Sequence, residues 1–388
     1  MNIFSYSKQT ISKKDIKSVT KILKSNFLTQ GKTVEIFEKK ICKLVKAKFG
    51  IASSSATSSL HIACLALDLK SNENLWTVAN SFVASANCAR YCGASVDFVD
   101  INPKTFNIDT NALEKKLKKT KKSKLPKILV VVHFAGEPTE MKKIFELKKK
   151  YKFKVIEDAS HALGAKINDS YIGSCKYSDL TVFSFHPVKP ITTAEGGIVT
   201  TNEKKLYIKL QMLRNHGITR NHNLYKNKNK YYWYYEQQIL GFNYRMNDIE
   251  AALGISQLNN LKKFNAERGR VVKFYKKSFK DLPIQFQLLS KKNLSTHHLC
   301  VVKFDFKKIK ISYNKLFEKL RKKRVGVNLH YLPIYNQPYY QSIKRYPKLK
   351  NTEAYYRSVM SIPVFPGLKN KSLRLVCKTI RKLILANL

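Results

Sequence analysis

The stretch DLTVFSFHPVKPITTAEGGIVTT, residues 179–201, contains two short apolar segments separated by a loop. Residues 179–185 and 195–201 are apolar enough to be strands buried on both faces, as strands in a covered parallel sheet are. Pro187 and Pro190 exclude a regular helix from the loop and stiffen the chain around Lys189. The stretch therefore predicts a lysine held in a defined position at one edge of a buried sheet.

The segments before this stretch alternate between strand-like and helix-like patterns. Such alternation predicts an α/β fold whose sheet is mostly parallel. Strands are predicted at 75–79, 95–101, 127–134 and 154–159, with a strand end near 49–53. Helices are predicted at 13–24, 33–46, 56–69, 81–92, 109–119 and 139–151.

The pattern changes after about residue 265, beyond the start of a long helical stretch at 246–282. Residues 297–306 and 325–333 are strand-like, whereas 312–323 and the end of the chain are helical. A chain of 388 residues exceeds the size at which a single core stops growing. We therefore expect two domains, a large α/β domain at 1–265 and a small α+β domain at 266–388.

The charge is strongly basic, with 73 Lys and Arg against 26 Asp and Glu and a net charge of +47. A nucleic-acid-binding protein is one interpretation of such a charge. The lysines are spread along the whole chain, however, and few of the basic residues are Arg, which supplies bidentate base contacts. We therefore expect no nucleic-acid partner, and a positive field that attracts anionic substrates.

No apolar run reaches the length of about 18 residues that a membrane-spanning helix needs. The first residues lack the apolar segment of a signal peptide, so we expect a cytoplasmic protein without a membrane partner. The seven cysteines have no zinc-like spacing and are expected to be reduced, mostly buried thiols. His297, His298 and Cys300 lie close together, but adjacent residues of a strand point to opposite faces. They are therefore a poor metal cluster, and no metal is expected.

Known nucleotide-binding motifs are absent from the sequence. QGKT at 30–33 lacks the earlier glycine and the preceding buried strand of a phosphate-binding P-loop. No G-x-G-x-x-G follows any predicted strand, which argues against a dinucleotide-binding domain.

Polar residues that could perform chemistry follow the predicted strands. The strand in KVIEDASHALGA, 154–165, ends on Glu157 and Asp158, and one of the two must point into the crevice where ligands bind. A helix N-cap is the structural alternative for this acid. Lys189 has the fixed position that a Schiff-base lysine needs, and SSSATSS at 53–59 precedes a helix that can bind an anion. These parts suit pyridoxal 5'-phosphate (PLP), with a structural loop and an incidental lysine as the alternative.

Three segments resemble a known family: IEDASHALGA at 156–165, FSFHPVKPITTAEGGIVTTN at 183–202 and LGFNYRMNDIEAALGISQL at 240–258. They are similar to the DegT/DnrJ/EryC1/StrS family of PLP-dependent sugar aminotransferases, and the resemblance extends from about Tyr6 into the C-terminal domain. It implies the aspartate-aminotransferase-like type I fold, with PLP bound by the large domain. It also implies a homodimer whose two active sites are shared between the subunits.

The resemblance implies a role for each matching residue. Lys189 is expected to hold the cofactor covalently, and Asp158 to pair with its pyridine nitrogen. His161 is expected beside the ring oxygen, where many members of the family have Gln. The other expected cofactor contacts are Ala56, Thr57 and Ser184 to the phosphate, Phe82 stacked on the ring, and Asn243 reaching the phosphate of the neighbouring subunit.

Residues 25–39, 189–197 and 328–340 resemble most the members of the pseudaminic acid pathway. Those enzymes move the amino group of L-glutamate to C4 of a UDP-linked 4-keto-6-deoxy-N-acetyl hexose. The aromatic stretch 231–238 resembles a family segment near the nucleotide-sugar site, with core packing as the alternative. The expected substrate contacts are Tyr6, Asn26, Phe27, Leu28, Thr29, His330 and Tyr331.

Other activities remain open within the resemblance. The substrate could be a different nucleotide 4-keto sugar, of the GDP-perosamine or bacillosamine type, or the protein could be a regulatory PLP-binding relative without activity. Related dehydrases carry His in place of the lysine, so Lys189 argues against that reaction. Glu137 is a departure, since relatives often have an uncharged residue there.

Overall fold

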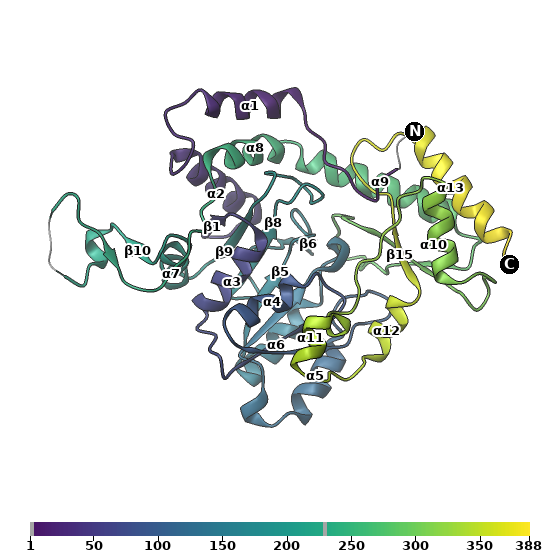
Figure 1. Cartoon of the computed structure of the whole chain (residues 1–388), viewed down its shortest axis with the longest axis horizontal. Coiled ribbons are helices and arrows are strands. Elements are labelled where there is room, and N and C mark those ends of the chain that lie inside the picture. Colours follow the sequence, from purple (N-terminus) through teal and green to yellow (C-terminus); the bar gives the residue numbers. More distant parts are fainter. Residues whose placement is uncertain (1–3, 228–230) are drawn as a thin grey trace.

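A seven-stranded sheet forms the centre of the computed structural model, which describes residues 4–227 and 231–388 (Figure 1). Five adjacent strands are parallel, β9 is antiparallel to both of its neighbours, and β1 closes the edge. The mostly parallel sheet predicted from the sequence is confirmed. The strand order is β1 (Phe49–Ser53), β9 (Gly197–Thr201), β8 (Leu180–Ser184), β5 (Lys154–Asp158), β4 (Ile128–Val132), β2 (Asn74–Val78) and β3 (Ser95–Val99).

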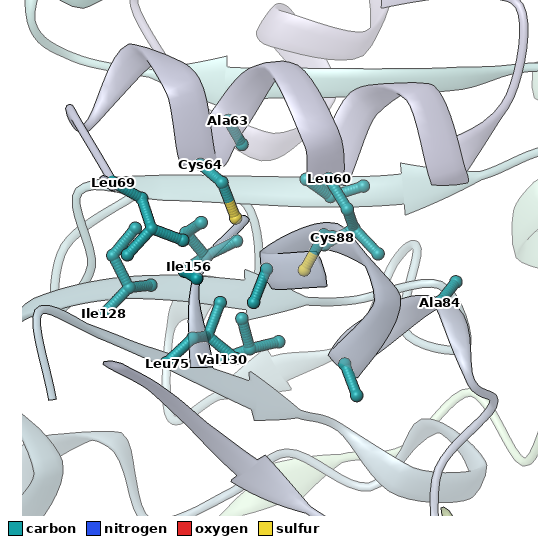
Figure 2. Packing of buried hydrophobic residues seen from close by; sticks show 14 of the residues in the cluster. Leu60, Ala63, Cys64, Leu69, Leu75, Ala84, Cys88, Ile128, Val130 and Ile156 are labelled. Carbon is teal, nitrogen blue, oxygen red and sulfur yellow. The ribbon is translucent and has the colours of Figure 1, made fainter. Parts of the chain in front are cut away.

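Helices cover both faces of this sheet, because successive side chains of each strand point to opposite faces. Figure 2 shows one face, where Leu60 and Cys64 of α3 pack with Leu75, Val130 and Ile156 of the strands. The covering helices are α3 (Ala56–Ala66), α4 (Ala84–Tyr91) and α7 (Lys204–Arg214) on that face, and α2 (Lys32–Val45), α5 (Thr110–Lys119) and α6 (Met141–Tyr151) on the other.

The N-terminal helix α1 (Lys13–Leu23) lies along α8 (Asp248–Leu258) above the sheet (Figure 1). Ser12 and Asp15 form a capping box that starts α1, and the Gln257 side chain of α8 donates to the buried Asp15 carboxylate at 2.8 Å. This contact attaches α1, which is otherwise largely exposed, to the body of the protein.

A second, antiparallel sheet forms the C-terminal part, with its own apolar core. Its strands are β12 (Ile284–Phe286), β14 (Cys300–Phe304) and β15 (Val359–Ile362), and α9 (Leu261–Ser278), α10 (Tyr313–Lys322) and α13 (Asn370–Leu385) pack on it. The remaining elements are short: α11 (Pro338–Ile343), α12 (Lys350–Tyr356), β6 (Lys166–Ile167), β7 (Ser170–Tyr171), β10 (Ile218–Thr219), β11 (Glu236–Gln237), β13 (Asn293–Leu294) and the 3₁₀ turns η1 (Lys122–Lys124), η2 (Phe134–Gly136), η3 (His222–Leu224) and η4 (Ile334–Asn336).

The structure corrects two predicted elements of the C-terminal half. The helical stretch 246–282 is two helices, because the chain turns at Asn259 and Asn260 between α8 and α9. Residues 325–333 are not a strand but an irregular segment with isolated bridges, one of them between Asn328 and Ser361. The boundary predicted at 265 falls inside α9, so one helix serves both predicted domains, and the division stays a prediction.

All seven cysteines are free thiols and six of them are buried, as predicted. Across residues 4–227 and 231–388, no helix is both long and apolar enough to cross a membrane.

Candidate active site

A cavity of about 520 Å³ opens at the carboxyl ends of β4, β5 and β8, beside the N-terminus of α3. This is where ligands bind in open α/β sheets, since the loops that follow the strands diverge there. The cavity brings together ten of the residues singled out from the sequence: Tyr6, Ala56, Thr57, Phe82, Asp158, His161, Ser184, Lys189, His330 and Tyr331.

One end of the cavity is built to bind an anion. The Ser55 side chain caps α3 by accepting from the Ser58 N–H at 3.0 Å, which leaves the first two N–H groups of the helix, at Ala56 and Thr57, without intrahelical partners. These groups stand at the positive end of the helix dipole. A Cβ on Gly197 would lie 2.6 Å from the Ala56 nitrogen, so β9 can start this close to the helix only with glycine. The residues therefore fit a phosphate group.

An acid lies at the end of β5, and strand alternation decides which one. Asp158 faces the cavity, where it accepts from the hydroxyls of Ser85 and Ser160, each at 2.6 Å. Glu157 points the other way and contacts the His133 ring at 2.7 Å. The open choice between the two acids is thereby settled in favour of Asp158, whose carboxylate is held in one orientation.

Lys189 reaches the same cavity from the loop between β8 and β9. Its N–H donates to the His186 carbonyl at 2.9 Å, and the buried Arg268 side chain donates to its carbonyl at 3.1 Å. Burial lowers the pKa of the Lys189 amine to about 8, although the Asp158 carboxylate raises it. A lysine with this pKa has an accessible neutral form, which is the nucleophilic one.

Two aromatic side chains and a histidine complete the wall of the cavity. Phe82 is 58% exposed in this chain although it lies inside a cavity, so its ring face is free to stack on a flat ligand. The Tyr331 ring lies 6.1 Å from Phe82, and its hydroxyl is 3.5 Å from His161 Nε2. An aromatic surface close to an anion site, an acid and a lysine fits all parts of PLP.

Five of the residues singled out from the sequence lie outside the cavity. Asn243 is exposed and forms an isolated bridge with Asn215. The other four, Asn26, Phe27, Leu28 and Thr29, are exposed in the turn between α1 and α2. Their expected roles stay predictions, and Asn243 was in any case expected to act on a neighbouring subunit.

Sequence reasoning missed the residues that support the site from a distance. Ser85 lies 73 positions from Asp158 and Arg268 lies 79 positions from Lys189, so no local pattern joins them. His298 was considered only as a metal ligand and rejected, yet it packs against His161. Ser160, two residues after Asp158, could have been found as a short polar residue beside a strand-end acid.

Glu137 belongs to a different and larger cavity of about 640 Å³, formed with residues 288–293. Its carboxylate accepts from the Ser290 N–H at 3.0 Å and from the Asn293 side chain at 2.8 Å. Glu137 therefore fixes a connecting segment, and this cavity contains neither Lys189 nor Asp158.

The type I fold and a cavity with a strand-end acid, a lysine of lowered pKa and a phosphate cradle define a PLP-dependent transaminase. The DegT/DnrJ/EryC1/StrS aminotransferase family matches residues 9–381 of the chain. The chain therefore belongs to this family of sugar aminotransferases.

Individual relatives match over nearly the whole chain. The UDP-4-amino-4,6-dideoxy-N-acetyl-beta-L-altrosamine transaminase of Campylobacter jejuni is 38% identical over 97% of this chain and 96% of its own length. The structure of Helicobacter pylori PseC, an aminotransferase of pseudaminic acid biosynthesis, superimposes with a TM-score of 0.89 at 31% identity and covers 99% of this chain and 100% of its own. The PLP form of the Streptococcus pneumoniae putative sugar aminotransferase Spr1654 shares the fold, with a TM-score of 0.90 at 23% identity over 100% of both chains.

Proposed function

We propose that the protein transfers the amino group of L-glutamate to C4 of a UDP-linked 4-keto-6-deoxy-N-acetyl hexose, as in pseudaminic acid synthesis. The observation that carries the proposal is the shared cavity. Tyr6, His330 and Tyr331, expected to contact the sugar, lie in the same cavity as Lys189 and Asp158. The Campylobacter relative named for this amino sugar supports the choice of substrate. We place the reaction in the cytoplasm.

Each group of the cavity has a task in such a reaction. PLP supplies an aldehyde that bonds to amines and a ring that accepts electrons. Lys189 would hold the cofactor through its neutral amine, and its free amine would move a proton as general base and then as general acid. Asp158 would keep the ring nitrogen protonated by its negative charge, and the N-terminus of α3 would hold the phosphate.

A neutral histidine and a tyrosine suit a site that handles a keto sugar. Burial, together with the charge of Lys189, lowers the pKa of His330 to about 3. Its Nδ1 lies 2.8 Å from the Ser361 hydroxyl, and its ring packs 5.0 Å from that of Tyr6. A neutral imidazole and a phenol offer hydrogen bonds to sugar hydroxyls without adding charge.

The test is a substrate panel. Purified protein is supplied with PLP, L-glutamate and nucleotide 4-keto sugars with UDP, GDP or dTDP, and products are read by mass spectrometry. We expect the mass of an amino sugar from the UDP-linked N-acetyl 4-keto sugar. Amination of a different nucleotide sugar alone would replace the substrate, and no amino sugar from any member would contradict the enzymatic role and favour a regulatory relative.

We also propose that two copies form a homodimer with shared sites. The segment around β10 and β11 projects from the body (Figure 1, left) and exposes Trp233 and Leu240 by 69% and 79%. Phe27, in the turn between α1 and α2, is 64% exposed. Large apolar side chains presented in this way are typical of protein interfaces. Asn243 follows the projecting segment directly.

Complementation between variants tests the shared site. Lys189→Ala removes the lysine, and Asn243→Ala removes a phosphate contact that we expect from the partner, which weakens PLP binding roughly 10-fold or more. A mixed dimer keeps one site with both residues. At limiting PLP we expect the mixture to recover roughly a quarter of wild-type turnover, since half of randomly paired dimers are mixed and each has one intact site. Turnover equal to the sum of the separate variants would contradict sharing through Asn243.

A further inference from the structure

The ring of His161 is held in one protonation pattern by the main chain. The Ala135 N–H donates to His161 Nδ1 at 3.2 Å. A nitrogen that accepts from an N–H has no proton of its own, so the proton of a neutral His161 ring is on Nε2. Nε2 lies 3.5 Å from the Tyr331 hydroxyl, and both side chains line the cavity. His161 therefore presents a hydrogen-bond donor to whatever binds there.

A second histidine lies directly behind this ring. The His298 ring centroid is 4.3 Å from that of His161, with 33° between the planes. His298 is 1% exposed, and its Nδ1 has no hydrogen-bond partner in the part of the chain that the structure describes. Two residues earlier, the Thr296 hydroxyl donates to the His161 carbonyl at 2.5 Å. The segment that leads into β14 thus holds both the main chain and the ring of His161.

The surroundings make a charged ring unfavourable at either position. Burial lowers the pKa of both histidines well below the usual range, and the positive charge of Lys189 lowers both further. His330 acts in the same direction on both, and the buried Arg268 guanidinium acts on His298. Asp158 is the acid of the same cavity, and each of its carboxylate oxygens accepts a hydrogen bond from a serine hydroxyl. Two imidazoles packed together beside the Lys189 and Arg268 cations remain neutral.

We propose that His298 is a positioning residue that keeps His161 neutral, with its proton on Nε2, so that His161 donates a hydrogen bond to the ring oxygen of PLP. The inference rests on the proposed place of the cofactor beside His161. A donor at that oxygen stabilises its negative charge and so lowers the pKa of the neighbouring nitrogen through which Lys189 joins the cofactor. The side-chain amide of Gln can supply the same kind of donor.

The first experiment uses the cofactor-free chain. Protein labelled with ¹⁵N-histidine is studied by NMR at about neutral pH, with His161→Gln used to assign the signals of His161. We expect a protonated Nε2 and an unprotonated Nδ1 in the wild type. His298→Ala should admit water and give a mixture of tautomers or a protonated ring, and His298→Phe should restore the single form because it keeps a stacked ring. A proton on Nδ1 in the wild type overturns the proposal without any variant, and so does a His298→Ala spectrum identical to the wild type.

The second experiment reads the bound cofactor by its absorbance during a pH titration. We expect His161→Leu to raise the pKa of the lysine–cofactor chromophore by about one unit, the worth of a hydrogen bond to a charged group. His161→Gln should keep the wild-type value. An unchanged pKa in His161→Leu would overturn the donor role. No sugar is present, so a failed substrate panel would leave both results standing.

Discussion

We expect Lys189→Ala to reduce turnover by roughly 10³-fold or more, because we propose that the lysine both bonds to the cofactor and moves the proton, and general acid–base catalysis alone contributes about 10²–10⁴-fold. The fold survives the change. The contacts described for the residue, from its N–H to His186 and from Arg268 to its carbonyl, belong to the main chain and remain. Alanine also removes the cost of holding a charged amine in a cavity. Turnover with glutamate and thermal unfolding by circular dichroism, measured on one preparation, check both parts.

Two matched variants separate position from charge. Lys189→Arg keeps the positive charge but cannot lose its proton, so we expect it to be as inactive as Lys189→Ala. Lys205→Ala removes an exposed lysine of α7 from the same basic chain, and we expect wild-type turnover. If Lys189→Ala retained more than roughly a tenth of wild-type turnover, a loss of only about 1.4 kcal/mol, the covalent role of this lysine would be wrong.

The sheet could be predicted because its strands are short apolar runs between amphipathic helices, a pattern that few other folds produce. The strand predicted at residues 325–333 is wrong for a physical reason. Their apolar and aromatic side chains imitate a strand, but Leu329, His330 and Tyr331 are there to line the cavity. A cavity wall and a sheet face select similar residues, and only strand pairing distinguishes them. Within residues 4–227 and 231–388, this segment pairs only at isolated bridges.

That Asp158 and Lys189 lie in one cavity could also be predicted, because each lies in a local motif at a strand end. Their supports could not, since Ser85 and Arg268 come from helices, and His298 from the segment before β14, all far away in the sequence. A lone serine within a helix, or an arginine among many basic residues, carries no signal until the fold brings it to Asp158 or Lys189. Residues in a local motif can be recognised from the sequence, whereas the residues that orient them are brought close only by packing.

Asp158→Asn lowers turnover by roughly 10²–10³-fold, the cost of removing one fixed electrostatic group from a catalytic site. The amide is the same size as the carboxylate, so its oxygen can still accept from the Ser160 hydroxyl, and its NH2 group, in place of the other carboxylate oxygen, can donate to the Ser85 hydroxyl oxygen. The negative charge is lost, and with it the attraction that we expect to keep the cofactor ring nitrogen protonated. The turnover rate and the absorbance spectrum of the bound cofactor measure the loss, and a variant with unchanged turnover would assign the electron sink to another group.

Glu157→Gln is the control that tests the argument from strand alternation. It neutralises the neighbouring acid, but Glu157 lies on the far side of β5 and holds the His133 ring at 2.7 Å and the Thr181 hydroxyl at 3.0 Å. We therefore expect a loss of stability of about 1–3 kcal/mol, typical of a weakened buried hydrogen-bond network, with the cofactor spectrum unchanged. The two variants should thus differ in kind: Asp158→Asn changes chemistry at constant stability, and Glu157→Gln changes stability at constant chemistry. The two acids differ above all in the face of β5 from which they project. An altered cofactor spectrum in Glu157→Gln would therefore mean that a charge near the end of β5 is enough, whichever face the acid projects from.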